Sequence, residues 1–520
     1  MLNCGMIRER IAELLPFFLP REVPERATTP EDSITVHAAA QRVDTAYERF
    51  RNLLDPGDED ILRRKAIVRF LSRRWELGSD AETFSLALLK NLASGKYIPD
   101  TTHRRYVTDV AVVVRKAFTL WQVGQRRLPA WFLPLLAVEI DRVLYPRDAD
   151  DALVYAFFED ARERTVWEDA TIAPAERDTQ LFLACHRSLA KTDDAELFWH
   201  LFRTAEPSWM GDPADEDLAH VAAHFAPLES EIERALRHPA ALRLLRKMQP
   251  SAVPYRILRD ILRREHAEDI LNDPTHLANA VAVVLTERVR RLERQMLRRV
   301  WHAALFLFLS KGVLAFALEI PYEVFLGDVR VVPLLINLLF PPTLLFLMAG
   351  SVPRPGPANT ERLVQIVRTI VSGEGVHSDV IVRAPARRAI QRSAFALAYG
   401  LVTLLLLIGI VWLLRIFQYS LVGGFFFVVF LGLVSFLGLR LRSSIRELRI
   451  VAPREGAMSV LIDFFTLPII DLGRQIALRA SQINVFLFIL DAIIEAPFKL
   501  LIGLAEEWFA YLRERKEELV

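Results

Sequence analysis

The strongest constraint on the fold of this 520-residue chain is that its long apolar stretches all lie after residue 300. Four such stretches, which carry little or no charge, cover residues 301–318, 331–352, 394–414 and 421–439. A helix of about 20 apolar residues crosses a bilayer core, and lipid offers an irregular backbone no hydrogen-bond partners. The sequence therefore predicts four transmembrane helices that follow a long, charged region.

Composition narrows the class of protein further. The 65 basic and 64 acidic side chains nearly cancel, so no polycationic surface suggests nucleic acid as a partner. Apolar residues make up 52% of the chain and charged residues 25%, which argues against wholesale disorder. Cys4 and Cys185 are too few for a disulfide framework or a four-cysteine zinc site.

Residues 1–285 are expected to form a soluble, all-helical domain. Apolar positions recur every three or four residues in segments that end at Pro, Gly or Asp clusters, such as Asp55-Pro56-Gly57. Charges interrupt Met1–Pro20, which predicts an amphipathic helix in place of a secretory signal. A compact bundle and a curved array of helix pairs both fit this pattern.

The distribution of arginine predicts the orientation in the membrane. Arginines are frequent in a basic juxtamembrane helix (286–300), in a loop lobe between the two hairpins (353–392) and after the last apolar stretch. Short basic loops stay on the cytoplasmic side, so we expect two hairpins (301–352 and 393–440) in a bacterial-type inner membrane, with both termini cytoplasmic. The same groups are candidate contacts for anionic lipid headgroups, in particular Arg298, Arg299, Arg387, Arg388, Arg440 and Arg442.

Other features of the second half leave alternatives open. Leu285, Val289, Leu292 and Met296 form one seam of a helix that either couples the domain to the membrane or pairs two copies, so a protein partner or self-association is expected. Residues 441–520 are predicted as amphipathic interfacial helices and a charged tail, with two further spans as the alternative. Val376–Val382, in the loop lobe, is the one segment that resembles a strand, and this lobe is expected to touch the front domain.

Lys311 is the leading candidate for a functional residue within the apolar stretches. A lysine near the middle of a span costs about 2.5 to 3.5 kcal/mol, so it should face an acid, other helices or water. Glu319 and Glu323 follow at helical spacing. The three residues predict either a structural ion pair or a polar track for an ion or proton.

Motifs for catalysis are scarce. Glu216, His220 and His224 share one helical stripe and are a weak candidate for a metal site, although Val221 stands where a zinc protease needs its glutamate. No Gly-rich phosphate loop or nucleophile elbow occurs in the sequence. No cofactor is therefore expected.

Three tracts resemble segments of uncharacterised bacterial multi-pass membrane proteins: Ile34 to Leu54, Leu62 to Ile67 and Asn484 to Trp508. The resemblance implies a membrane class and no particular activity. Three functions remain. The first is a non-enzymatic, membrane-anchored scaffold or interaction module. The second is a transporter or channel component that uses Lys311 and Glu319, and the third is an enzyme that acts on a lipid-linked substrate.

Overall fold

The computed structural model describes residues 9–18, 32–34, 59–75, 80–99, 101–123, 130–326, 330–350, 355–373, 380–383, 389–446, 448, 450 and 467–476. These residues divide into two compact units, each of which is described by itself. The first unit comprises Met1–Glu287, Pro355–Pro385 and Glu447–Val451, and the second comprises the rest of the chain. Both are almost entirely helical, which confirms the predicted all-α class.

One part of the first unit consists of helices packed around a large apolar core. Trp75, which is 1% exposed, lies at its centre against the rings of Phe84, Phe118 and Phe132. Asp80 caps one helix by accepting hydrogen bonds from the backbone of Glu82 and Thr83. The helices and short helical turns of this part are α3 (Glu59–Arg74), α4 (Ala81–Ser94), α5 (Arg105–Val123), α6 (Phe132–Leu144), α9 (Asp194–Ala205), η3 (Pro207–Trp209) and α10 (Asp215–Leu236).

The other part of the first unit contains α11 (Ala241–Leu262), which contacts α7, α8 and α12. Phe157 of α7 and Tyr255 of α11 join the two helices with ring centroids 4.7 Å apart. The elements of this part are α1 (Glu9–Ala12), η1 (Leu15–Phe18), α7 (Asp148–Arg164), α8 (Pro174–Leu189), α12 (Ala267–Asn272) and the first turns of α13 (Pro274–Leu314).

A distant segment of the chain completes the first unit. Strand β1 (Thr165–Trp167) pairs in parallel with β2 (Val380–Val382), with Thr165 opposite Val380. Helix α16 (Pro357–Ser372) packs on α11, and its Asn359 accepts a hydrogen bond from the backbone of Ile450 at 2.8 Å. The predicted strand near Val382 and its contact with the front domain are confirmed, whereas β1 was not foreseen.

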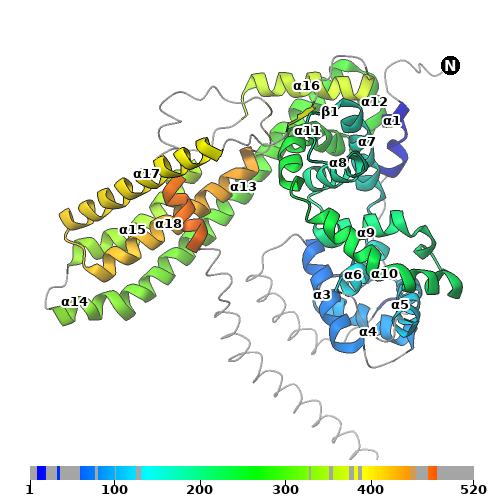
Figure 1. The fold of residues 1–520 in the computed structure, drawn as a ribbon, viewed down its shortest axis with the longest axis horizontal. Helices are drawn as coiled ribbons and strands as arrows, with labels where there is room; N and C mark the ends of the chain where they lie inside the picture. Colours follow the sequence, from blue (N-terminus) through cyan, green and yellow to red (C-terminus); the bar gives the residue numbers. More distant parts are fainter. Residues whose placement is uncertain are drawn as a thin grey trace, which may run out of the picture. The chain divides into compact units, whose positions relative to one another are not determined.

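Long helices make up the second unit, and several of them run lengthwise beside one another (Figure 1). Helix α13 continues into a π-helical turn, η4 (Ala315–Glu319), and then into α14 (Ile320–Leu326). The others are α15 (Val331–Gly350), α17 (Ala389–Ile416) and α18 (Leu421–Arg446).

Three helices are long and apolar enough to cross a membrane within the part of the chain that the structure describes. They are Val331–Gly350, Leu397–Ile416 and Leu421–Leu439, which match three of the four predicted spans. The stretch 301–318 does not qualify as a fourth. Its helix carries Lys311 and gives way at Ala315 to the π-helical turn that ends in Glu319, so charge interrupts the apolar run.

The second unit buries a narrow core and leaves apolar side chains outside. Val300, Ala304 and Leu307 of α13 pack with Leu345 of α15 and Val434 of α18. Large apolar side chains on the outer faces remain exposed, among them Trp301 at 66%, Phe306 at 67% and Leu397 at 75%. Such a surface is typical of helices that contact lipid.

The predicted C-terminal amphipathic helices (441–520) lie mostly outside the described residues. Backbone helix extends through Arg446, and a further helical segment covers residues 467–476. The tract that begins at Asn484 lies outside the described residues entirely, as does most of the tract from Ile34 to Leu54. The seam residues Leu292 and Met296 pack against the core of the second unit.

Candidate functional site

The structure brings Lys311 and Glu319 together inside the second unit. The Lys311 ammonium donates a hydrogen bond to Glu319 at 2.9 Å, and the two side chains are 0% and 1% exposed. Eight residues of α-helix turn about 80° beyond two full turns. The π-helical turn η4 holds more residues per turn and so rotates Glu319 back toward Lys311.

Two neighbouring helices close this charged pair. Asn337 of α15 donates a hydrogen bond to Glu319 at 2.8 Å and another to the carbonyl of Gly423 at 3.2 Å. The Lys311 ammonium also lies 4.8 Å and 5.0 Å from the ring centroids of Phe426 and Phe430 on α18. These contacts compensate part of the cost of burying the charge.

Glu323 does not join the pair. It accepts a hydrogen bond from the backbone of Arg330 at 3.1 Å and one from the Ser420 hydroxyl at 3.3 Å. The Arg330 guanidinium in turn donates to the carbonyl of Gln418 at 2.6 Å. The predicted polar track is therefore divided into a buried pair and a separate cluster where the turns before α15 and α18 meet.

Two buried polar atoms near the pair have no hydrogen-bond partner among the described residues. They are the amide oxygen of Asn337 and the hydroxyl of Tyr419. Reversing the Asn337 amide would place its oxygen against two acceptors, so its hydrogen bonds fix the orientation. These two atoms leave room for a further polar contact in an otherwise apolar region.

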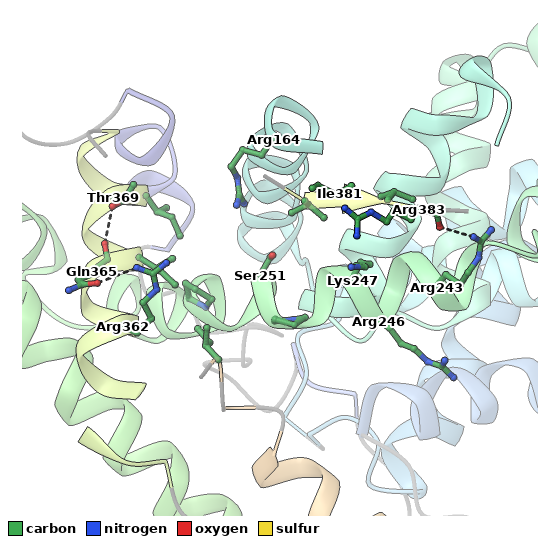
Figure 2. A pocket seen from close by; sticks show the side chains of 17 residues that line it. Arg164, Arg243, Arg246, Lys247, Ser251, Arg362, Gln365, Thr369, Ile381 and Arg383 are labelled. Atoms are coloured by element: carbon green, nitrogen blue, oxygen red, sulfur yellow. Dashed lines mark hydrogen bonds between the residues drawn. The ribbon is translucent and has the colours of Figure 1, made fainter. Parts of the chain in front are cut away.

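A second candidate site is a basic pocket in the first unit, which has a volume of about 740 Å³. Helix α11 forms one wall, α16 a second and strand β2 a third, while Arg164 at the end of α7 closes one side. Figure 2 shows Arg164 and Ser251 directed into the space between α16 and β2. The walls thus come from stretches of the chain that are far apart in sequence.

Arginine and lysine are the charged residues that line this pocket. Among the described lining residues, six are cationic and none is an acid: Arg164, Arg243, Arg246, Lys247, Arg362 and Arg383. Three of the six pair with acids that are not among the lining residues, because Arg164 contacts Asp160, Arg243 contacts Asp169, and Arg383 contacts Glu168. Three positive charges remain.

The acid behind Arg243 is firmly ionised. Burial alone would raise the pKa of Asp169, but hydrogen bonds from Thr171 and Arg243 outweigh it and lower that pKa. By contrast, the side chains of Arg246 and Lys247 have no ion pair or hydrogen bond within the described chain, and Arg362 contacts only the neutral Gln365 at 3.3 Å. Arg246 turns away from β2, and Lys247 and Arg362 are the two other lining cations without an acid partner among the described residues (Figure 2).

Sequence reasoning missed this pocket because no local motif encodes it. Its residues lie near positions 164, 246, 365 and 382 and come together only through tertiary packing and the β1–β2 pairing. A partial signal was available in the cluster Arg243, Arg246 and Lys247. The arginines of the segment that follows α15 were interpreted as indicators of membrane orientation and as contacts for lipid headgroups, and not as parts of a pocket.

The stripe formed by Glu216, His220 and His224 lies on the exposed side of α10. The rings of His220 and His224 are 4.3 Å apart, and His220 lies 3.7 Å from Glu206. Within the described chain, no group of three or more His, Cys, Asp or Glu side chains has the geometry of a metal site. This candidate therefore gains no support from the structure.

The predicted lipid-contact arginines differ in how far they can be located. Arg298 and Arg299 are exposed on α13, as a headgroup contact requires. Arg440 and Arg442 lie on α18, but their side chains are outside the described residues, as are Arg387 and Arg388 altogether.

No protein-family model matches the chain, and no curated protein or solved structure shows significant similarity to it.

Proposed function

We propose that the chain is a non-enzymatic, membrane-anchored interaction module that holds a helical binding domain at a bilayer. The observation that carries this proposal is the composition of the first unit, which is assembled from three stretches of the chain. Apolar helices separate these stretches, since α15 precedes Pro355–Pro385 and α17 and α18 follow it. A domain assembled in this way is tethered to its membrane part at several points.

This assembly supports an even number of crossings between successive stretches. Because Pro355–Pro385 packs within the same unit as Met1–Glu287, the chain between them must return to the side from which it left. Helix α15 supplies one crossing. We infer that the other crossing is made by the end of α13 together with α14. In this segment the buried Lys311 pairs with Glu319, and the outer face is apolar.

Contacts at the turns support the same inference. The Arg330 guanidinium, which precedes α15, donates to Gln418 in the link between α17 and α18, and Ser420 donates to Glu323. The two turns therefore lie at one end of the second unit. If the link at Gln418 is across the membrane from the domain, the end of α14 is there too.

The arginines favour the cytoplasmic side of a bacterial-type inner membrane for the domain. Arg298 and Arg299 on α13, together with Arg362 and Arg368 on α16, flank the apolar helices on the domain side. The turns at the other end carry Arg330 and Arg415. This bias supports a cytoplasmic location for both termini.

Cysteine labelling of whole cells tests this arrangement. In a Cys4→Ser background the remaining Cys185 is silent, because it is fully buried and burial raises the pKa of its thiol. We expect Phe325→Cys and Gln418→Cys to react with a membrane-impermeant maleimide in intact cells. Both positions are exposed.

Cysteines on the domain should react only after permeabilisation. The exposed positions Glu216 on α10 and Arg368 on α16 serve for this arm. If Glu216→Cys and Arg368→Cys are labelled from opposite sides of the membrane, the inference that their two stretches of the domain lie on one side is overturned. If Phe325→Cys and Glu216→Cys are labelled from the same side, the end of α13 and α14 do not cross the membrane.

A transporter or channel component is the second candidate, and the two unpartnered polar atoms beside Lys311 and Glu319 favour it. The closure of the pair by Asn337, Phe426 and Phe430 argues against an open path. Ion flux through reconstituted vesicles distinguishes the two functions. Flux in the parent chain that the double variant Lys311→Met with Glu319→Gln abolishes supports transport, and a parent chain without flux supports the anchored module.

A further inference from the structure

We propose that the basic pocket of the first unit binds a ligand in which a phosphate group is joined to an apolar group. The proposal goes beyond the anchoring role and does not rest on it, because every lining residue belongs to the first unit. A volume of about 740 Å³ lies within the usual range of small-molecule sites.

The charges of the pocket select an anion. Lys247 and Arg362 have no acid partner among the described residues, and Arg164 reaches the same space from α7 while it contacts Asp160 at 2.5 Å. Arginine offers a planar fork that matches phosphate oxygens, and lysine adds a point charge. The Ser251 hydroxyl, also directed into the space, can donate a further hydrogen bond (Figure 2).

The rest of the lining selects an apolar group attached to the anion. Ile366 and Ile370 of α16 and Pro250 and Pro254 of α11 are among the lining residues, and Ile381 of β2 adds a third apolar wall. A free inorganic anion would leave this surface in contact with water. A ligand with an alkyl or ring portion would bury it and gain hydrophobic free energy.

Such a ligand would hold together walls from distant parts of the chain. Helix α11 belongs to the stretch before the apolar helices, whereas α16 and β2 lie between α15 and α17. A ligand that contacts Lys247 and Arg362 at once would brace these two segments. Hydrogen exchange should therefore slow in residues 241–262 and 357–372 together when the site is filled.

The test uses the full chain in nanodiscs of phosphatidylcholine, with calorimetry as the readout. The probes are hexyl phosphate, inorganic phosphate and hexanol. We expect hexyl phosphate to bind more tightly than inorganic phosphate and hexanol not to bind. Absence of hexyl phosphate binding, or equal binding of hexyl and inorganic phosphate, would overturn the proposal.

Variants then locate the site. Loss of a charge-assisted hydrogen bond weakens binding about tenfold or more, so Lys247→Ala with Arg362→Ala should weaken hexyl phosphate at least that much. Two control variants remove exposed arginines outside the pocket and should leave binding unchanged. They are Arg368→Ala, also on α16, and Arg234→Ala on α10. Unchanged binding in the double variant rejects this pocket as the site.

A third variant separates the two halves of the ligand. Ile366→Ser should weaken hexyl phosphate and leave inorganic phosphate unaffected, and equal weakening of both would contradict the apolar half of the proposal. Should the double variant fail to fold, Arg362→Gln alone, at an exposed position, replaces it with the same expected direction.

The phosphate group can come from a lipid headgroup or from a soluble phosphate ester. Nanodiscs that contain phosphatidylglycerol distinguish these sources. Weaker hexyl phosphate binding to the parent chain in these nanodiscs than in phosphatidylcholine alone identifies a headgroup, and undiminished hexyl phosphate binding identifies a soluble ester.

Discussion

Each unit contains a buried ion pair with the same separation, but the surroundings of the two pairs differ. Lys311 and Glu319 in the second unit and Arg64 and Glu196 in the first are both 2.9 Å apart. Lys311 has one acid partner among the described residues and two aromatic rings. Glu196 instead accepts hydrogen bonds from three guanidiniums, those of Arg64, Arg142 and Arg147.

The difference shows how the two environments stabilise charge. The network around Glu196 reaches the surface through partly exposed acids, since Asp60, Asp151 and Asp193 are 25% to 31% exposed. Burial alone would raise the pKa of Glu196, but the nearby guanidiniums outweigh it and lower that pKa. The Lys311 pair has no such route to water, so each of its members depends on the other.

The largest effect is expected from breaking the isolated pair. Lys311→Met leaves Glu319 buried with only the Asn337 amide, and removal of one partner of a buried pair costs about 3 to 5 kcal/mol. The double variant Lys311→Met with Glu319→Gln should recover most of this loss. Thermal unfolding of the full chain in nanodiscs measures both. Additive losses in the double variant would show that the two groups are not coupled.

A smaller loss of stability is expected when the network around Glu196 is changed. Glu196→Gln keeps an acceptor for one guanidinium and leaves the acids at the edge of the network in place, so the loss should be about 2 to 3 kcal/mol. Because the pKa of Glu196 is lowered in the fold, its contribution is present above the ordinary carboxyl range and is lost as the pH falls through it. Urea unfolding should therefore show a weaker acid dependence in Glu196→Gln, and an identical pH profile would contradict the assignment.

Two buried histidines beside this network predict a pH dependence nearer neutrality. Burial lowers the pKa of His186 to about 4 and that of His200 to about 2, and His200 accepts a hydrogen bond from Arg142. Asp151, Glu196 and the neighbouring arginines are the charged groups around them.

Unfolded histidine takes up a proton near pH 6.5, whereas the folded pair stays neutral. Stability is therefore complete above that pH and falls below it by about 1.4 kcal/mol per pH unit for each histidine. His186→Phe, which can pack on Phe182, should remove one such contribution from the slope between pH 7 and pH 5. Tryptophan fluorescence during urea unfolding measures the slope, and an unchanged slope would mean that His186 is not buried as a neutral ring.

The features that could be predicted from the sequence are those encoded locally. Apolar run length located the helices that became α15, α17 and α18. The sequence also named Glu319 as a partner for Lys311, but their contact depends on the π-helical turn η4, which was not predicted. Asn337 was missed because nothing near it in sequence indicates that it would meet Glu319.

Features built from distant residues could not be predicted. Strand β1 has three residues and exists because β2, more than 200 positions later, pairs with it. The Glu196 network joins α3, α6 and α9, and the basic pocket joins α11 to α16 and β2. Each of these depends on how helices pack, which hydrophobic periodicity leaves undetermined.

The smallest effect should come from an ion pair of the same length at the surface. Arg162 and Asp178 are also 2.9 Å apart, but their side chains are 54% and 53% exposed. Exposed pairs contribute roughly 0 to 1 kcal/mol because water and salt screen the attraction and two flexible side chains must be ordered. Arg162→Ala should therefore lower stability by less than about 1 kcal/mol, and salt should weaken even this effect. A loss equal to that of Glu196→Gln would show that separation between the charges, and not burial, decides what each pair contributes.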